Sequence, residues 1–533
     1  MKQKIDIENI RQLHREGKLD EAKAGYLAML RINPRDADIL HGLGIVNTQQ
    51  KNFSEAIDYL KKAITLSPKD PSIQLNLANV LKLQGLFTQA VSLLENVISD
   101  HPSYAPAFNN LGTVYYALGK FDEAITAYHK AIDIFPTYID AYYNLGLALT
   151  KKNLLLDAIQ VYQKIISHTP DHFASRFHLA CLFMQQDNIP AALKEFLNIE
   201  TTYPYHFETQ TNLANCYLKQ GAFNEAKTHY LKALELHAED VQILFNMGVI
   251  NMQQGYIDHA IQYYQRAVRI NPDYFAAQNN LGVAFLAKQH AGYALQHFKE
   301  ALRIQPKNTA VAYTVNMLAQ NRRLLTAPPD YIQSLFDAYA DHYDSHLMKA
   351  LDYKIPTLFR NALIKLLPSQ KLDILDLGCG TGLCATPFKA NANTLTGVDL
   401  SHNMLEMAKE KHIYDELIQS DLTTFLADKI DRYDLILAGD VLVYIGELDS
   451  LFKYISQACR EQGLVIFNAE ISDADTYKMN QSGRFSHSKD YLDKLATENQ
   501  FKIEDYQACT SRLQNNEPVY GHLYVLRKKR DNL

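Results

Sequence analysis

The chain of 533 residues contains no tryptophan, only six cysteines and no apolar run long enough to span a membrane. The cysteines are scattered without metal-ligand spacing, so we expect reduced thiols, a cytoplasmic location and no metal site. The first residues alternate charged with apolar side chains, and we therefore expect no secretory signal and no membrane partner. The formal net charge of −6 gives no electrostatic reason to expect nucleic acid as a partner.

The length predicts at least two domains, because single hydrophobic cores stop growing at roughly 250–300 residues. Hydrophobic residues make up 47% and charged residues 21% of the chain, a balance typical of folded proteins. From Lys371 onward the pattern changes to short apolar segments that alternate with helical ones. The two parts are therefore expected to differ in fold class.

Three kinds of residue recur every 34 positions over the first three-fifths of the chain, apart from one proline step of 68, where Ala238 takes the missing place. They are prolines (Pro34, Pro68, Pro102, Pro136, Pro170, Pro204, Pro272 and Pro306), alanines (Ala22, Ala56, Ala90, Ala124, Ala158, Ala192, Ala226, Ala260 and Ala294) and small residues (Gly44, Ala78, Gly112, Gly146, Ala180, Ala214, Gly248 and Gly282). Nine units between residues 3 and 308 fit this register, which predicts a repeat domain over residues 1–308.

Each unit is expected to form two antiparallel helices that approach closely at the small residue and the alanine. Bulky residues such as Tyr128 and Tyr162 would fill the groove beside them, and proline ends the second helix. One unit cannot bury its apolar face alone, so the units stack into a solenoid. The period and the small positions resemble the tetratricopeptide repeat, although the tryptophan of that repeat is absent. The resemblance implies an all-α superhelix that binds a protein or peptide.

A row of side-chain amides occupies one position of the repeats and is expected on the inner surface of the solenoid. The row consists of Asn76, Asn110, Asn144, Asn212, Asn246 and Asn280, and His178 completes it between Asn144 and Asn212. Each amide donates and accepts, so the row suits the backbone of an extended peptide. A similar asparagine ladder lines the repeats of O-linked N-acetylglucosamine transferase. The alternative is that these asparagines only brace the turns between helices, and both interpretations stay open.

The periodicity fades after Pro306, and we predict a linker over residues 309–330, where Pro328 and Pro329 exclude a helix. A second domain is predicted over residues 331–529, opening with cap helices, the second of them over 355–366. Its short apolar strands alternate with helices, a pattern typical of an α/β fold with a mainly parallel sheet. The predicted strands cover residues 372–377, 394–398, 416–418, 433–438, 464–468, 501–509 and 519–526.

A glycine-rich segment, Gly378–Gly382, follows the first predicted strand. Ligands of open α/β sheets bind at the carboxyl ends of strands, and glycines let the loop backbone approach them. Asp376 is expected to orient this loop or to accept from a ligand ammonium group. Asp399 ends the second strand, where a carboxylate accepts both hydroxyls of a ribose, and Asp421 is expected near an adenine amino group. The spacing G-x-G-x-G after an acidic residue suits an amino-acid tail better than a pyrophosphate.

The segment DLGCGTG is similar to the first motif of class I S-adenosylmethionine-dependent methyltransferases, and VDLSHNML is similar to their ribose segment. The resemblance covers roughly residues 330–529 and implies a Rossmann-like methyltransferase domain with S-adenosylmethionine as its cofactor. The residues that it assigns to cofactor binding are Asp376, Gly378, Cys379, Gly380, Gly382, Asp399, Leu400, Met404, Asp421, Leu422, Gly439 and Tyr343.

Methyl transfer from a sulfonium requires alignment of the acceptor, and a general base if the acceptor is a hydroxyl or a protonated amine. Tyr444, after the fourth strand, is expected either to line the substrate pocket or to pack beneath the next helix. The segment around Arg484 and His487 is similar to a Gly-Arg-aromatic-x-His-Ser motif of bacterial methyltransferases fused to tetratricopeptide repeats. This resemblance implies a substrate contact for Arg484, while His487 is either a general base or a structural histidine at a helix start.

The chain lacks the Asn/Asp-Pro-Pro-Tyr/Phe box and the Pro-Cys pair after the fourth strand, which disfavours nucleobases and amides as acceptors. The leading hypothesis is a methyltransferase whose repeats capture a protein or peptide acceptor, with a small-molecule acceptor left open. The alternative hypothesis is a scaffold whose methyltransferase-like domain only binds S-adenosylmethionine or is inactive.

Overall fold

The computed structural model describes residues 7–319, 326–337, 339–340, 343–349, 351–480, 482–514 and 517–530. The chain divides into two compact units, Met1–Ala238 and Glu239–Leu533. None of the described helices is both long enough and apolar enough to cross a membrane.

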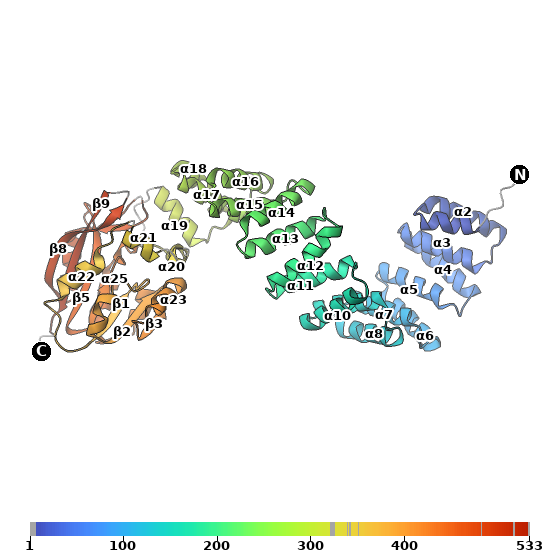
Figure 1. Ribbon diagram of the computed structural model, residues 1–533, viewed down its shortest axis with the longest axis horizontal. Helices are drawn as coiled ribbons and strands as arrows, with labels where there is room; N and C mark the ends of the chain where they lie inside the picture. Colours follow the sequence, from blue (N-terminus) through green and yellow to red (C-terminus); the bar gives the residue numbers. More distant parts are fainter. Residues whose placement is uncertain are drawn as a thin grey trace. The chain divides into compact units, whose positions relative to one another are not determined.

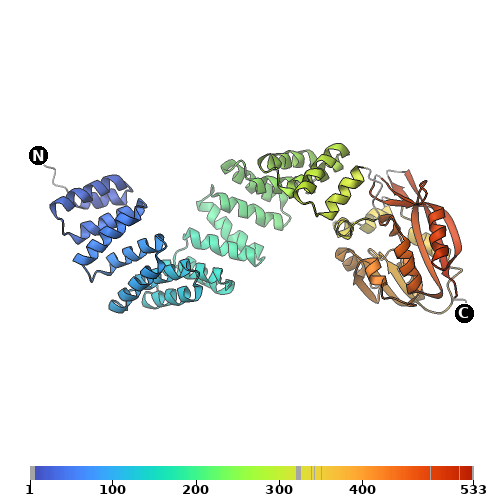
Figure 2. The same cartoon turned by 180° about the vertical axis from the view of Figure 1, so that it is seen from behind.

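The first unit consists of seven antiparallel helix pairs in its described part (Figures 1 and 2). The first helix has 13 residues in every pair except the first, where α1 has nine, and the second helix has 14 residues in every pair. The helices are α1 (Ile7–Arg15), α2 (Leu19–Ile32), α3 (Ala37–Gln49), α4 (Phe53–Leu66), α5 (Pro71–Leu83), α6 (Phe87–Asp100), α7 (Ala105–Ala117), α8 (Phe121–Ile134), α9 (Ile139–Lys151), α10 (Leu155–His168), α11 (Phe173–Gln185), α12 (Ile189–Thr202), α13 (Phe207–Lys219) and α14 (Phe223–Leu236).

The helix pairs pack through the small residues that the sequence predicted. A Cβ atom added to Gly112 would lie 2.5 Å from the ring of Tyr128, and one added to Gly146 would lie 2.7 Å from that of Tyr162. The alanines of the second helices, such as Ala124, are fully buried. The small residue thus lets the tyrosine ring approach the backbone of the first helix closely, so the predicted packing is confirmed.

The second unit begins with two further pairs and one additional helix. These helices are α15 (Val241–Gln253), α16 (Ile257–Ile270), α17 (Phe275–Ala287), α18 (Ala291–Ile304) and α19 (Thr309–Leu318). The helix α19 lies in the segment predicted as a linker. Its Val311 is buried against α18, so α19 packs as the first helix of a further pair would. Residues 320–325 of that segment lie outside the described residues. The proposed domain boundaries at residues 308 and 331 stay a prediction.

A second difference from the sequence prediction concerns the paired prolines. The helix α20 (Pro329–Asp337) begins at Pro329, whereas the pair was expected to exclude a helix. Proline is tolerated in the first turn of a helix because the amide missing there has no intrahelical partner. The cap helices α21 (Tyr343–Lys349) and α22 (Ile355–Leu363) follow.

The remainder of the chain folds as the predicted α/β domain. Its elements are β1 (Leu372–Leu377), η2 (Thr386–Asn391), β2 (Ala392–Asp399), α23 (His402–Glu410), β3 (Glu416–Gln419), α24 (Leu422–Leu426), β4 (Tyr433–Ala438), η3 (Leu442–Tyr444), α25 (Asp449–Ala458), β5 (Cys459–Ile471), β6 (Tyr477–Met479), β7 (Phe485–His487), α26 (Lys489–Glu498), β8 (Phe501–Gln514) and β9 (Glu517–Lys528). The bounds of β1 and β4 are those predicted. The three-residue strands β6 and β7 were missed, because they are too short to show an alternating pattern.

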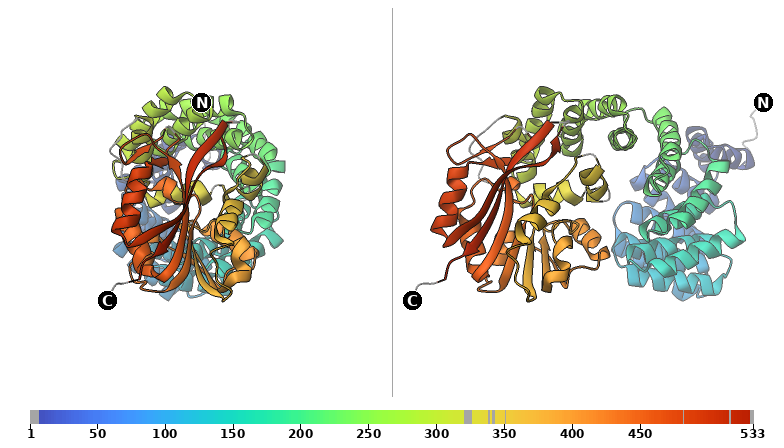
Figure 3. Two further views of the ribbon diagram at one scale, coloured as in Figure 1. Left: turned by 90° about the vertical axis from the view of Figure 1, so that its left-hand side faces the viewer. Right: turned by 60° about the vertical axis from the view of Figure 1, so that its left-hand side comes forward.

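One twisted sheet contains all these strands, in the order β3-β2-β1-β4-β5-β7-β6, and β9 lies between β5 and β8. The strands β1 to β5 run parallel, and β9 is antiparallel to β5. Helices cover both faces (Figure 3). Phe359 of α22 and Phe388 of η2 are buried on one face, and Phe452 of α25 and Leu492 of α26 on the other. The order reverses at β1, so the carboxyl ends of β1 and β4 diverge there and leave room for a ligand.

Candidate functional site

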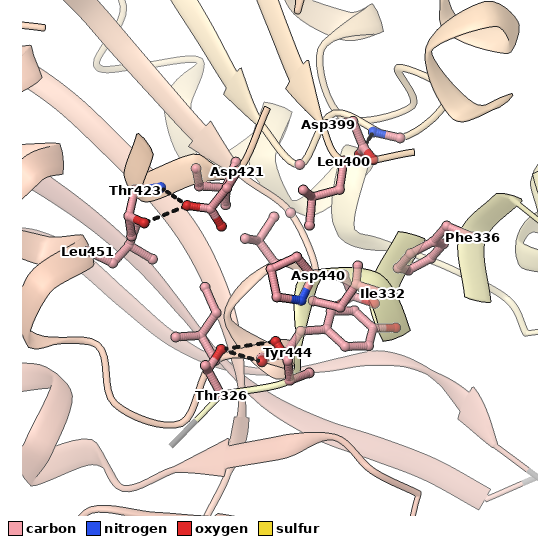
Figure 4. Close-up of a pocket in the computed structure, with 18 of the residues that line it drawn as sticks. Thr326, Ile332, Phe336, Asp399, Leu400, Asp421, Thr423, Asp440, Tyr444 and Leu451 are labelled. Atoms are coloured by element: carbon pink, nitrogen blue, oxygen red, sulfur yellow. Dashed lines mark hydrogen bonds between the residues drawn. The ribbon is translucent and has the colours of Figure 1, made fainter. Parts of the chain in front are cut away.

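A cavity of about 360 Å³ lies at the carboxyl ends of β1, β2 and β4. Nine of the residues proposed from the sequence line it: Gly378, Gly380, Asp399, Leu400, Asp421, Leu422, Gly439, Tyr343 and Tyr444. Figure 4 shows Asp399 and Asp421 on neighbouring strand ends and the Tyr444 ring pointing towards Phe336. The strand-end rule therefore brought most of the predicted residues to one place, and their roles toward a ligand stay predictions.

The loop after β1 presents its backbone to this cavity. Gly378 has φ +61° and Gly380 has φ +52°, a left-handed conformation that favours glycine. A Cβ on Gly378 would lie 2.5 Å from the Val441 side chain. A Cβ added to Gly380 would meet no atom closer than 3.9 Å, on the ring of Tyr343. This part of the backbone is therefore open to a ligand.

Asp399 fastens the glycine loop to the end of β2. Its Oδ2 accepts from the Gly380 amide at 2.8 Å, and its Oδ1 accepts from the Ser401 amide at 2.9 Å. Burial raises the pKa of Asp399, although these backbone hydrogen bonds oppose the effect. The same carboxylate therefore shapes the loop and lines the cavity.

Asp421 is the N-cap of α24. Its Oδ1 accepts from the Thr423 amide at 3.0 Å (Figure 4) and from the Thr424 amide at 3.1 Å. These capping bonds all use Oδ1, so Oδ2 is the oxygen that a bound ligand would meet.

Four of the residues predicted to bind the cofactor lie outside the cavity lining: Asp376, Cys379, Gly382 and Met404. Asp376 is buried beneath the loop, where its Oδ2 accepts from the Tyr414 hydroxyl at 2.6 Å. Burial raises the pKa of Asp376 to about 7 despite this hydrogen bond. Gly382 packs on the Tyr414 ring, and Met404 is buried in the core at the start of α23. These residues are buried or packed behind the loop and do not line the cavity.

Asp440, directly after β4, belongs to a buried network of charged groups that the sequence analysis missed. Its Oδ1 accepts from Asn468 at 2.7 Å and its Oδ2 accepts from Arg484 at 3.1 Å. Glu470 accepts from Arg484 at 2.8 Å and from Arg512 at 2.9 Å. Burial alone would raise the pKa of Asp440, but the two arginines and Asn468 hold it below its ordinary value. A carboxylate is thus fixed in its charged form at the cavity wall.

Arg484 reaches the cavity only through other residues. Its guanidinium donates to the Tyr444 hydroxyl at 3.0 Å as well as to Asp440 and Glu470. Arg484 does not itself line the cavity, whereas Tyr444 and Asp440 do. The contacts of Arg484 position residues of the cavity wall. They do not support the predicted direct contact between Arg484 and the substrate.

His487 is not placed as a general base. It ends the strand β7, and its Nε2 lies 2.9 Å from the Ile445 carbonyl and 3.1 Å from that of Gly446. Since both carbonyls accept, Nε2 carries the proton, and Nδ1 is buried with no hydrogen-bond partner in the described part of the chain. Burial lowers the pKa of His487 to about 4. We therefore correct the base assignment to the structural alternative. The helix capped by Ser488 that was predicted next is confirmed.

One wall of the cavity comes from residues that the sequence analysis had placed in a linker or a cap helix. It is formed by Thr326, Ala327, Pro329, Ile332 and Phe336. The Ala327 amide donates to the Tyr444 carbonyl at 2.9 Å, and Phe336 meets the Tyr444 ring edge-on at 5.5 Å. No local motif marks these residues, because their role depends on where the segment folds back.

The cap helix α21 holds the other end of the glycine loop. The hydroxyl of Thr381 donates to Asp344, and Lys411 donates to the same carboxylate at 2.6 Å. Tyr343 beside it lines the cavity, and Tyr339 meets the Tyr343 ring edge-on at 5.4 Å. Tyr343 and Asp344 thus both lie at the loop.

The asparagines of the repeats are all partly exposed, and several bond to side chains of an adjacent helix. Asn144 donates to Asn109 at 3.0 Å, and Asn280 donates to Tyr264 at 3.3 Å. Asn76 lies 2.7 Å from His41, one repeat earlier. These contacts support bracing, while the partial exposure leaves each amide within reach of a ligand. Neither interpretation is eliminated.

The cavity is rich in carboxylates. Asp399, Asp421, Asp440 and Glu447 line it, and no lysine, arginine or histidine stands among its described lining residues. Across the described residues, no group of three or more His, Cys, Asp or Glu side chains is arranged to hold a metal ion. Such a lining suits a ligand with positive charge.

Comparison with known families identifies both parts of the chain. The description "Methyltransferase domain" matches residues 375–467. Descriptions of the tetratricopeptide repeat match residues 12–71, 47–113, 112–153, 139–172, 214–255 and 250–289.

Curated relatives match part of the chain. The "Ubiquinone biosynthesis O-methyltransferase" of Bartonella quintana is 30% identical over 115 residues, which cover 21% of this chain and 47% of the relative. The "Malonyl-[acyl-carrier protein] O-methyltransferase" of Priestia megaterium is 28% identical over 182 residues, which cover 32% of this chain and 61% of the relative. The chain thus spans about half to three-fifths of the length of these relatives.

Among solved structures, the C-terminal part of a TPR repeat-containing protein from Cytophaga hutchinsonii is similar with a TM-score of 0.42 and 16% identity. The match covers 45% of this chain and 99% of that one. A SAM-dependent methyltransferase from Methanosarcina mazei has a TM-score of 0.28 and 12% identity, over 32% of this chain and 98% of that one.

Proposed function

From a chain that joins tetratricopeptide repeats to a methyltransferase domain, we propose an S-adenosylmethionine-dependent methyltransferase whose repeats hold a protein or peptide. When bound, S-adenosylmethionine supplies a methyl group on a sulfonium. The observation that carries the proposal is the glycine loop at the carboxyl end of β1, held open by Asp399 beside the cavity. Gly378 and Gly380 would lie against the amino-acid tail, Asp399 would hold the ribose and Asp421 the adenine.

The charges of the cavity support a cationic ligand. S-adenosylmethionine carries a net positive charge near neutral pH, and the lining holds four carboxylates without a cationic side chain. Asp440 stays ionised because Arg484, Arg512 and Asn468 hold it so. The same lining disfavours an anionic acceptor, since like charges repel in a partly desolvated site.

The acceptor side is apolar. Ile332, Phe336, Ile445 and Leu451 line it, together with the Tyr444 ring. Burial raises the pKa of Tyr444 although Arg484 lowers it, so the phenol stays protonated near neutral pH. Tyr444 is therefore a hydrogen-bond donor and an apolar wall. These walls exclude water and align an uncharged acceptor.

Titration calorimetry with S-adenosylmethionine and S-adenosylhomocysteine tests the cofactor site. Asp399→Asn keeps the shape of the side chain but replaces one acceptor oxygen by an amide, so it loses the bond from Gly380 or from Ser401. We expect the dissociation constant to rise about tenfold or more.

Asp415→Asn is the matched control. Asp415 also accepts a backbone amide, from Leu395 at 2.8 Å, but it does not line the cavity. Its affinity for both compounds should stay within twofold of the unsubstituted protein. Equal affinities of the Asp399 variant and the unsubstituted protein would contradict the assignment of Asp399 to the ribose. If the unsubstituted protein and the control variant bind neither compound, S-adenosylmethionine is not the cofactor.

A further inference from the structure

The helix α19, which follows the last helix pair, contacts the α/β domain directly. Its Tyr313 is fully buried, and the Tyr313 hydroxyl donates to the Gly483 carbonyl at 2.8 Å. The Tyr313 ring lies 4.7 Å from that of Tyr331 on α20. Burial raises the pKa of Tyr313, so the hydroxyl keeps its proton and stays a donor at physiological pH.

The contact at Gly483 leaves no free space. Gly483 has φ +76°, and a Cβ there would lie 2.7 Å from the sulfur of Met317 on α19. The Gly483 amide donates to Asn480 at 3.0 Å, and the Asn480 amide donates to the Arg484 carbonyl at 2.7 Å. The backbone next to Arg484 is therefore fixed from one side by its own turn and from the other by α19.

Arg484 connects this fixed backbone to two residues of the cavity wall. Its guanidinium holds the Tyr444 hydroxyl at 3.0 Å and the Asp440 carboxylate at 3.1 Å, and both of these residues line the cavity. Arg484 has no other route to a ligand, since it is not itself part of the lining. A shift of its backbone would therefore move two groups of the wall together.

A second tether from the same region of the chain meets Tyr444 at its backbone. The Ala327 amide donates to the Tyr444 carbonyl at 2.9 Å, the Thr326 hydroxyl donates to it at 3.3 Å, and Thr326 forms an isolated antiparallel bridge with Ile445 (Figure 4). Tyr444 is thus held at its phenol through α19 and at its carbonyl by the residues before α20.

We propose that α19 positions the acceptor wall of the methyltransferase cavity, with Tyr313 as the positioning residue that acts through Gly483 and Arg484 on Tyr444. The inference rests on the proposed function, because it takes this wall as the methyl-acceptor side. It makes the end of the repeat array part of the acceptor site, so a ligand that shifts α19 would change acceptor alignment without touching the cofactor side.

The absence of tryptophan from the chain allows a direct spectroscopic test. Phe336→Trp places a single indole in the wall, next to the Tyr444 ring that Phe336 meets at 5.5 Å. Into this background we would introduce Tyr313→Phe, which removes only the hydroxyl that binds Gly483. Tyr274→Phe is the control, since Tyr274 donates to Gln242 inside the repeats at 3.1 Å and not to the α/β domain.

Acrylamide quenching of the introduced indole and transfer of tritiated methyl from S-adenosylmethionine to lysate components are then compared. We expect Tyr313→Phe to raise the quenching constant about twofold and to slow methyl transfer about tenfold, with S-adenosylmethionine affinity within twofold of the Tyr274→Phe control. Met317→Leu, which alters the contact with Gly483 at similar volume, should act in the same direction with a smaller change.

Quenching in the Tyr313 variant equal to that in the Tyr274 variant would overturn the positioning role. A loss of S-adenosylmethionine affinity equal to the loss of transfer would also overturn it, because the effect would then be structural and not confined to the acceptor wall. The proposed function fails separately if the unsubstituted protein binds no S-adenosylmethionine. The quenching comparison still decides the positioning role in that case.

Discussion

The repeats and the α/β domain differ in the sequence spacing of the residues that pack against one another. In the repeats, the contacting residues are separated by fixed steps, such as Gly112 with Tyr128 and Asn144 with Asn109. In the α/β domain, the groups that meet most tightly come from irregular positions, such as Arg512 with Glu470. The Arg303–Asp273 ion pair of the repeats is exposed, whereas the Arg512–Glu470 pair of the α/β domain is buried.

This contrast bears on function. A packing contact that recurs along the solenoid can be lost in one repeat while the next repeat keeps its own. A buried network of four charges does not divide in this way, because the loss of one member leaves the others unpaired in a medium of low polarity. The cavity wall depends on the network, so the α/β domain is expected to tolerate substitution of these residues poorly.

The largest expected effect is that of Arg512→Met. It leaves Asp440 and Glu470 with Arg484 alone in a buried site, and removal of one partner from such a network costs about 3–5 kcal/mol. We expect much faster hydrogen exchange in β5, β8 and β9 of the full chain, measured by mass spectrometry, with exchange in α3 to α14 unchanged.

Arg303→Met provides the matched control in the repeats. Its partners Asp273 and Glu300 are exposed, and exposed ion pairs contribute less than about 1 kcal/mol. Slow exchange of β5 that persists in the Arg512 variant would show that the network is not required for the stability of the domain.

A second, smaller effect concerns pH. The folded Asp376 loses its proton near pH 7, whereas an unfolded aspartic acid does so near pH 4. Between these values the folded state binds more protons than the unfolded state, so the contribution of Asp376 to the free energy of unfolding falls as the pH rises. We expect Asp376→Asn, which can still accept from Tyr414, to be more stable than the unsubstituted protein at pH 8 by on the order of 2–4 kcal/mol, and equally stable near pH 4.

The measurement is the difference between the melting temperatures of the two proteins by calorimetry from pH 4 to pH 8. The difference cancels the titration of other groups such as Asp399, whose pKa is also raised by burial. Parallel curves over this range would show that the buried carboxyl at Asp376 has an ordinary pKa.

The smallest expected effect on stability is that of changing Asn110, Asn144 and Asn212 together to alanine. Of these, Asn144 donates to the neighbouring repeat, and the better helix propensity of alanine offsets part of that loss, so we expect about 1 kcal/mol or less. Pull-down should lose the proteins that the unsubstituted chain captures. Gln89, Gln163 and Lys194, exposed on second helices, give a matched triple-alanine control. A clear loss of stability with unchanged partners would favour bracing instead.

Much of the candidate site followed from the sequence. Gly378, Asp399 and Asp421 meet at one cavity because parallel strands bring their carboxyl ends to the same edge of a sheet. The resemblance also assigned Met404 to the cofactor and offered His487 as a base, but both side chains are buried outside the cavity lining, since a motif states which residues are near a loop and not which side of it they take. It also passed over Asp440, whose role depends on Arg484 and Arg512.

The sequence by itself determined the helical repeats, the parallel sheet and the position of the glycine loop, because each depends on contacts at fixed or short spacing along the chain. Only the tertiary structure decided which charges share the buried network and that residues 326–336 form a cavity wall. Those pairings join segments more than a hundred residues apart in the case of Ala327 and Tyr444. Their geometry is set by how the elements pack, for which the chain carries no periodic signal.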